Sequence, residues 1–202
     1  LIGHNGAGKS TTIKSLVSII SPSSGRILVD GQDLSENRLA IKRKIGYVAD
    51  SPDLFLRLTA NEFWELIASS YELTSSDLEA SLARLLSVFD FAENRYQVIE
   101  TLSHGMRQKV FVIGALLSDP DIWVLDEPLT GLDPQAAFDL KQMMKEHAQK
   151  GKTVLFSTHV LEVAEQVCDR IAILKKGHLI YCGRVEDLRK DHPDQSLESI
   201  YL

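Results

Sequence analysis

The sequence predicts an α/β fold in which a largely parallel sheet is covered by helices and interrupted by an all-helical insertion. Strand-like and helix-like segments alternate before residue 54 and again after residue 118, and this alternation is typical of parallel sheets. Between about residues 54 and 117 no segment has the pattern of a strand. The 202 residues, 44% of them hydrophobic, suffice for one large domain, and a net charge of −6 does not favour nucleic-acid binding.

The chain begins with its strongest motif. Residues 3–10, GHNGAGKS, fit G-x-x-x-x-G-K-[ST], the phosphate-binding loop called Walker A. Backbone N–H groups of such a loop cradle phosphate oxygens, and a helix that begins near Lys9 aims its dipole at them. Lys9 can reach the β- and γ-phosphates, and the Ser10 hydroxyl can bind Mg²⁺. We expect nucleotide contacts from Gly3, His4, Asn5, Gly6, Ala7, Gly8, Lys9, Ser10 and Thr11.

A glycine-rich turn that binds nothing is the alternative, but the context favours nucleotide binding. Leu1 and Ile2 resemble the end of a strand, and an apolar helical stripe follows the loop. Because this loop normally follows a complete strand, we expect that the chain lacks N-terminal strands of its domain. The two cysteines, Cys168 and Cys182, have no metal or redox spacing and indicate free thiols in a reducing compartment. No apolar run reaches the roughly 18 to 20 residues that a membrane span needs.

The remaining elements follow from periodicity and from capping residues. Thr59 and Glu62 fit a capping box that starts one helix of the insertion, and Ser75 or Ser76 is expected to cap the next. Asp133 and Pro134 fit the start of a helix that ends near residue 150. We expect further helices at 9–20, 35–44, 160–168 and 185–190, the last followed by Pro193, and strands at 26–29, 45–49, 122–125, 153–157, 171–174 and 178–182.

The strand at 122–125 ends in two acids, Asp126 and Glu127, which is a Walker B pattern. At the carboxyl end of a parallel strand these side chains face the phosphate site. We expect Asp126 to hold Mg²⁺ through a water and Glu127 to accept a proton from the attacking water. An ordinary acidic turn is the alternative, but that interpretation takes no account of the phosphate loop in the same fold.

Taken together, these motifs make the chain resemble the nucleotide-binding domain of ABC transporters. Residues 102–108, LSHGMRQ, match the family's signature position, residues 129–133, LTGLD, its D-loop, and residues 157–159, STH, its switch histidine. The resemblance covers the whole chain in the right order. It implies one ABC ATPase domain over residues 1–202, with a P-loop NTPase core of the RecA type at 1–53 and 119–202 and a helical subdomain at 54–118.

The resemblance also implies roles for residues outside the phosphate loop. Ser103 and Gly105 would contact the γ-phosphate of a second copy, so that each ATP lies between two chains in a head-to-tail dimer. His159 would bond to the γ-phosphate and join Glu127 and Lys9 as a catalytic residue. Asp133 would both cap its helix and contact the opposite chain.

Three positions depart from the family pattern. Asp50 replaces the usual glutamine, where it keeps an oxygen ligand for Mg²⁺, loses the amide donor, and suggests slower or differently coupled hydrolysis. His104 and Met106 replace a glycine and a glutamine of the signature. We expect the His104 ring to point away from the phosphates and the contacts of Ser103 and Gly105 to persist.

The predicted function is that of the ATP-binding and ATP-hydrolysing subunit of an ABC transporter, with an export-like pattern and with ATP and Mg²⁺ as cofactors. It would work as a dimer on the cytoplasmic face of the membrane and dock on integral membrane subunits. We expect two or three apolar side chains of residues 51–64 to be exposed for docking, among Phe55, Leu56, Leu58, Phe63 and Trp64. The alternatives are a soluble ABC ATPase that acts on ribosomes or DNA, and a weakly hydrolysing, nucleotide-gated regulator, which Asp50 suggests.

Overall fold

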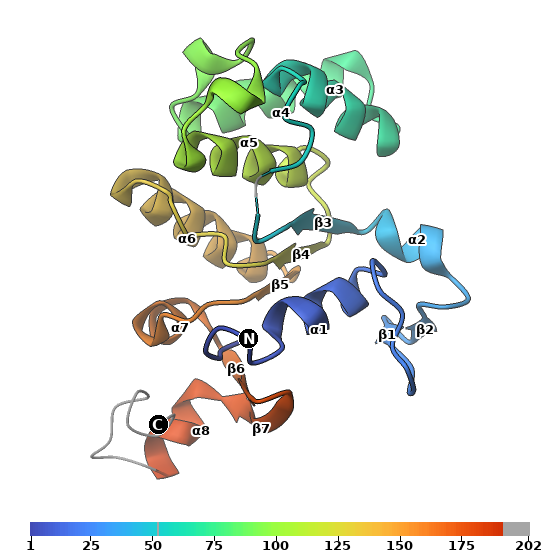
Figure 1. Cartoon of the computed structure of the whole chain (residues 1–202), viewed down its shortest axis with the longest axis vertical. Helices are drawn as coiled ribbons and strands as arrows, with labels where there is room; N and C mark the ends of the chain where they lie inside the picture. Colours follow the sequence, from blue (N-terminus) through green and yellow to red (C-terminus); the bar gives the residue numbers. More distant parts are fainter. Residues whose placement is uncertain (52, 192–202) are drawn as a thin grey trace.

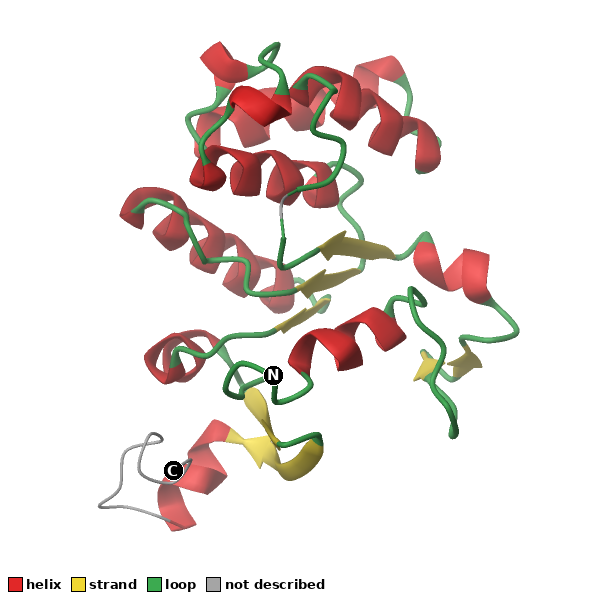
Figure 2. Ribbon diagram, viewed as in Figure 1, coloured by secondary structure: helices red, strands yellow, loops and turns green. Residues whose placement is uncertain are grey.

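The computed structural model describes residues 1–51 and 53–191, so Pro52 and Pro193 lie outside it. A helical layer lies at one end, a parallel sheet flanked by helices in the middle, and a hairpin with a short helix at the other end (Figure 1; Figure 2). The helical layer contains α3 (Ala60–Ser70), α4 (Ser75–Val88), two short 3-10 turns (Ala92–Asn94 and Ile99–Thr101) and α5 (His104–Leu116).

The central sheet is parallel, as the alternation of elements predicts. Its strands run in the order β3, β4 and β5, with Val48 paired to Leu125 and Leu125 to Phe156. Ile2 forms parallel bridges to both Thr158 and Ile173, so the residues before the phosphate loop lie between β5 and β6. The strands are β3 (Ile45–Val48), β4 (Ile122–Leu125) and β5 (Thr153–Phe156).

Alternate residues of the central strands pack on opposite faces of the sheet. On β4, Val124 packs with α1 (Lys9–Leu16) and α2 (Arg38–Lys42). Trp123 and Leu125 pack on the other face with α5 and α6 (Pro134–Gln149). Helices therefore cover both faces of the sheet. The carboxyl edge of the sheet is left as the place where polar side chains can gather.

Two antiparallel hairpins lie outside the parallel sheet. The expected strand at 26–29 is shorter than predicted and pairs with a partner that the sequence did not indicate. The second hairpin is followed by a short helix, and a further helix connects it to β5. These elements are β1 (Leu28–Val29) with β2 (Gln32–Asp33), β6 (Arg170–Lys175) with β7 (His178–Arg184), α7 (Leu161–Val167) and α8 (Val185–Asp191).

Several predicted boundaries are wrong for identifiable reasons. The first helix ends at Leu16 and not near residue 20, because Ser18 adopts a left-handed conformation with φ of 59°. The capping box of Thr59 and Glu62 is confirmed. The next helix, however, is capped by Thr74, whose hydroxyl accepts from the Asp77 N–H in a second capping box. Ser75 and Ser76 are therefore the first residues of α4 and not its cap.

The helical layer is built on aromatic and leucine side chains. Trp64 is fully buried, and its indole N–H donates to the carbonyl oxygen of Val110 on α5 at 2.9 Å. In residues 53–121 the chain forms no strand, and a single bridge joins Thr59 to Val98. None of the helices in residues 1–51 and 53–191 combines the length and the apolar character that crossing a membrane requires.

Candidate active site

The phosphate loop has the backbone conformation that its glycines permit. Gly6 and Gly8 have φ of 79° and 104°, in the left-handed region where a side chain is strained. A Cβ atom at Gly3 would lie 2.8 Å from the carbonyl oxygen of Leu174 on β6. The Gly177 N–H donates to the Ala7 carbonyl at 3.0 Å. The loop is therefore held in shape by the turn of the second hairpin.

The N-terminus of α1 can accept an anion. Gly8 precedes the helix and offers no side-chain oxygen to the first-turn N–H groups, and the first turn contains no acidic residue. Ser10 is half-buried and Thr11 is exposed within this turn. Free N–H groups and the helix dipole together favour a phosphate at this position. His4, Asn5 and Gly6 are exposed, so they are open to a ligand.

Lys9 is almost completely buried, and its ammonium group contacts the loop and the acid that follows β4. Its Nζ donates to the Gly3 carbonyl at 2.7 Å and lies 3.2 Å from Glu127 Oε1. The contact to Glu127 is an ion pair whose geometry is not that of a hydrogen bond. A buried ammonium requires anionic or carbonyl partners, and phosphate oxygens can replace those that it has here.

Glu127 and His159 meet at the carboxyl edge of the sheet. Glu127 has a left-handed φ of 48°, and its N–H donates to the Ser157 hydroxyl at 2.9 Å. Its Oε2 lies 3.0 Å from Nδ1 of His159, so the acid lies between an ammonium and an imidazole. Both residues line a pocket of about 270 Å³, together with Ser157, Thr158 and others. The predicted catalytic side chains are thus brought together.

Asp126 is fully withdrawn from solvent and carries one carboxylate oxygen without a partner. Oδ1 accepts from the Ser157 hydroxyl, whereas Oδ2 has no hydrogen-bond partner within residues 1–51 and 53–191. Ser157 is a site residue that sequence reasoning did not single out. The only signal for it was its place at a strand end beside Thr158 and His159.

The residues at this edge fit a magnesium ion. Mg²⁺ takes most of its ligands from water and substrate phosphates and needs only one or two protein oxygens. The free Asp126 oxygen and the Ser10 hydroxyl would supply them. Asp50 is exposed and follows β3 by two residues. The structure groups no three His, Cys, Asp or Glu side chains as a metal site in the part of the chain that it describes.

Negative charge at the same edge of the sheet affects the pKa of Tyr47. Burial raises the pKa of Tyr47 to about 12, and the carboxylates of Asp126 and Asp50 add to the rise. The phenol therefore remains neutral at any physiological pH.

Ser103 and Gly105 lie apart from the phosphate loop of their own chain. Ser103 caps α5, with its hydroxyl accepting from the Met106 N–H at 3.3 Å. Figure 1 places α5 in the helical layer, well separated from the loop that precedes α1. The His104 ring lies against Gly131, close enough that a Cβ on that glycine would be 2.5 Å from the ring.

Asp133 is engaged within its own chain. Its Oδ1 accepts from the Ala136 N–H at 2.9 Å, which confirms it as the cap of α6. Its Oδ2 lies 2.7 Å from Nζ of Lys109 on α5. The bond from Lys109 and the capping N–H hold the pKa of Asp133 below its usual range. The carboxylate is half exposed and remains open to a further partner.

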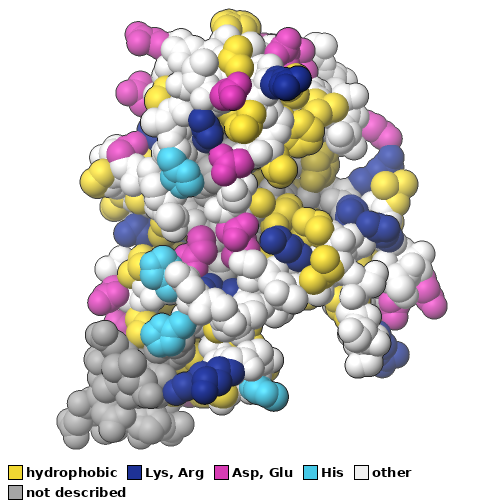
Figure 3. Space-filling view, viewed as in Figure 1, with side chains coloured by type: hydrophobic (Ala, Val, Ile, Leu, Met, Phe, Trp, Pro, Cys, Tyr) yellow, Lys and Arg dark blue, Asp and Glu magenta, His cyan; other side chains and the backbone are white. Residues whose placement is uncertain are grey.

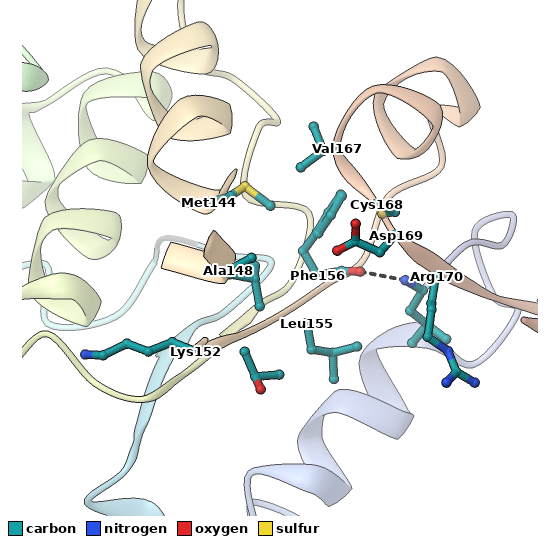
Figure 4. Close-up of a pocket in the computed structure, with 12 residues that line it drawn as sticks. Met144, Ala148, Lys152, Leu155, Phe156, Val167, Cys168, Asp169 and Arg170 are labelled. Carbon is teal, nitrogen blue, oxygen red and sulfur yellow. Dashed lines mark hydrogen bonds between the residues drawn. The ribbon is translucent and has the colours of Figure 1, made fainter. Parts of the chain in front are cut away.

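A second pocket, of about 240 Å³, contains none of the predicted site residues. It lies between α6, β5 and the end of α7, where Met144, Phe156 and Cys168 face one another (Figure 4). The amino group of Leu1 donates to the Phe156 carbonyl at 2.6 Å. Cys168 and Cys182 are free thiols, as predicted. Burial raises the pKa of the Cys168 thiol, which keeps it protonated, and we assign this pocket no chemistry.

Comparison with known proteins agrees with this geometry. A family model described as ABC transporter matches residues 1–130, which is well over half of the chain. The chain belongs to the ABC transporter family. The ABC transporter ATP-binding protein EcsA of Bacillus subtilis is 36% identical over all of this chain and 83% of its own length. An uncharacterized ABC transporter ATP-binding protein of Nostoc is 38% identical over 93% of this chain, which spans only 56% of that relative.

Solved structures of ABC ATPases share the fold. One, described as the ATP binding subunit of an ABC transporter, has a TM-score of 0.91 and 36% identity, over 99% of this chain and 84% of the other. An ATP-binding cassette solved as a dimer in a post-hydrolysis state with ADP and Pi has a TM-score of 0.80 and 26% identity, over 91% of this chain and 83% of the other. The architecture is therefore that of a P-loop NTPase with the helical layer of this family.

Proposed function

We propose that the chain is the ATP-binding and ATP-hydrolysing subunit of an ABC transporter. The observation that carries this proposal is the line of three groups Lys9, Glu127 and His159, joined by contacts of 3.2 and 3.0 Å. They come from three separate segments and meet beside a helix N-terminus that can hold phosphate. Relatives aligned with the chain are named as ATP-binding proteins of ABC transporters, among them a Nod factor export ATP-binding protein of Rhizobium leguminosarum.

Each of these residues has a chemical task in phosphoryl transfer to water. Glu127 accepts a proton from the attacking water through Oε1 or Oε2. His159 orients Glu127 and bonds to the transferred phosphate, while Lys9 offsets the negative charge that spreads over its oxygens. A magnesium ion held by Asp126 and Ser10 would supply further charge stabilisation. Catalysis in this class depends mainly on positioning and on charge, which the buried edge of the sheet provides.

Lys9 and Glu127 form an ion pair, and the ammonium also donates to the Gly3 carbonyl. Binding of ATP would draw Lys9 toward the phosphates and release one oxygen of Glu127 for a water. Asp50 keeps an oxygen at the position where the family has an amide, and we propose that it assists Mg²⁺ through water.

We further propose a head-to-tail dimer and docking to membrane subunits from the cytoplasmic side. Ser103 and Gly105 are remote from their own phosphate loop, so they are available to a second copy. Hydrophobic side chains gather over the helical layer in the space-filling view (Figure 3). Of the five candidates for docking, Phe55 is exposed, Leu56 and Leu58 are half-buried, and Phe63 and Trp64 are buried. Leu54 and Leu66 are also exposed and extend the surface.

The test is the rate of ATP hydrolysis by the purified protein with Glu127→Gln and, as a matched control, Glu146→Gln. Glu146 is an exposed acid on α6, away from the phosphate loop. We expect hydrolysis to fall at least about a hundredfold in the first variant, because the proton acceptor is lost. Nucleotide should still bind, and the control should match the wild type. Equal rates in Glu127→Gln and the wild type would overturn the catalytic assignment.

A separate observation tests the transport assignment. Affinity purification of the protein from membranes should recover a polytopic membrane protein with it, and Phe55→Asp should weaken that recovery. An exposed apolar side chain that docks loses its contact when it becomes charged. Recovery with ribosomes or DNA instead would favour the soluble ATPase. Tight nucleotide binding with no hydrolysis in the assembled complex would favour the regulator.

A further inference from the structure

The start of α5 is in direct contact with the loop that runs from Glu127 to Asp133 after β4. The Gly105 backbone passes so close to the Gly131 carbonyl that a Cβ at position 105 would not fit. The His104 ring lies where a side chain on Gly131 would be, and Gly131 has a left-handed φ of 80°. Close backbone contact of this kind leaves no room for the two segments to slide without separating.

Polar contacts reinforce this contact along the same face of α5. Lys109 is 15% exposed, and its Nζ lies 2.7 Å from Asp133 Oδ2 while it also donates to the Phe89 carbonyl at 3.1 Å. Gln108 is buried, and its amide donates to the Pro128 carbonyl at 3.4 Å. A partly buried ion pair with a second hydrogen bond is more rigid than an exposed pair.

The two joined segments carry groups of the proposed site at their ends. Ser103 caps α5 six residues before Lys109, about 9 Å along the helix axis. Glu127 begins the loop that Asp133 ends. A displacement of the loop at Asp133 is therefore passed to Ser103 by a helix, which is stiff over that length.

We infer that Lys109 is a positioning residue, whose ion pair with Asp133 ties Ser103 to Glu127 within one chain. This inference rests on the proposed function. In the proposed head-to-tail dimer, Glu127 acts on the nucleotide of its own phosphate loop, while Ser103 contacts the nucleotide of the partner. The pair thus links the two nucleotide sites, so that closure over one ATP places the groups that act on the other.

Two substitutions each remove the ion pair but keep most of the side chain that is changed. Lys109→Met keeps most of the apolar stem and loses the charge. Asp133→Asn keeps an oxygen that can cap α6 and loses the charge. In the full chain, each should lower the kcat of ATP hydrolysis about tenfold, because small misplacements of catalytic groups have large effects on rate. KM should stay within about twofold, and the Hill coefficient for ATP should fall toward 1.

The double variant and two controls make the test specific. Lys109→Met with Asp133→Asn should lose no more than either change alone, because both remove one interaction. Lys109→Arg should restore the rate and the cooperativity. Lys152→Met is the matched control, since Lys152 is 23% exposed and pairs with Asp119, away from the site. Additive losses, failure of Lys109→Arg, or equal effects of Lys152→Met would overturn the inference.

Hydrogen exchange separates failure of this inference from failure of the proposed function. Peptides that cover residues 128–133 should exchange faster in Lys109→Met and in Asp133→Asn than in the wild type or Lys152→Met. Unchanged exchange would overturn the tie between α5 and the loop, whatever the activity. A wild type that hydrolyses no ATP would instead overturn the proposed function, while the exchange data would still decide whether Lys109 holds the loop.

Discussion

The hydroxyl of Ser157 donates a hydrogen bond to the buried carboxylate of Asp126. Both side chains are fully withdrawn from solvent, and the same hydroxyl accepts from the Glu127 N–H at 2.9 Å. One serine, directly after β5, therefore positions both acids of the site. Its removal leaves a buried carboxylate and a backbone N–H without a partner.

Ser157→Ala should accordingly destabilise the fold by about 2 to 3 kcal/mol, because unpaired buried polar groups retain their desolvation penalty. The measurement is urea unfolding at neutral pH. Ser70→Ala is the control, since Ser70 is exposed and its hydroxyl donates to the Leu66 carbonyl of its own helix. The control should change stability by less than about 0.5 kcal/mol. Equal stabilities of the two variants would contradict the role of Ser157.

Stability should fall in mild acid because of His147. Its ring stacks on Trp123 with centroids 4.0 Å apart, and burial, followed by the charge of Lys152, lowers the pKa of His147. As pH falls below about 6.5, the unfolded chain binds this proton before the folded chain does, so stability is present above that pH and is lost below it. The slope for one proton is at most about 1.4 kcal/mol per pH unit.

His147→Phe keeps an aromatic ring beside Trp123 and removes the titrating group. Unfolding curves between pH 5 and 8 should therefore show a shallower acid loss in this variant than in the wild type. Substitution of His178, which is exposed on β7, serves as the control and should leave the slope as it is. An unchanged slope in His147→Phe would assign the acid loss to other groups.

Gly131→Ala should cost more than Gly151→Ala, although both glycines have φ of 80°. A Cβ at position 151 meets open space, whereas one at position 131 would lie 2.5 Å from the His104 ring. The shared backbone strain is about 1 kcal/mol or more, and overpacking adds about 1 to 3 kcal/mol at position 131 alone. Adding His104→Ala should recover the second part. No recovery in the double variant would show that His104 is not the obstacle.

Asp50→Gln should weaken the response of hydrolysis to Mg²⁺. The change removes one negative charge from the edge that also contains Asp126, and Mg²⁺ prefers charged oxygens. Because Asp50 is exposed, screening limits the effect to a rise of about two- to fivefold in the Mg²⁺ concentration for half-maximal rate. A titration with Mg²⁺ at saturating ATP measures it. A lower half-maximal concentration would show that Asp50 does not assist the ion.

The parallel core and the three groups Lys9, Glu127 and His159 could be predicted because local sequence patterns encode them. The Gly-rich loop, the apolar strand before Asp126 and the cap at Asp133 each depend on a few neighbouring residues. Ser157 escaped prediction because its role comes from the register of β5 beside β4, which spacing along the chain does not reveal. The contact of Lys109 with Asp133 likewise joins two elements that only the folded sheet brings together. The cap at Thr74 could not be predicted from the usual capping pattern, because its partner Asp77 is an aspartate where that pattern has glutamate or glutamine.

The bond from Gly177 to Ala7 has a consequence for synthesis of the protein. The phosphate loop is made before the second hairpin, yet one of the contacts that shape it comes from a turn about 170 residues later. A chain emerging from the ribosome therefore carries an incompletely supported loop until that turn has been translated and has folded. Tight binding of nucleotide therefore requires that the second hairpin has folded against the phosphate loop.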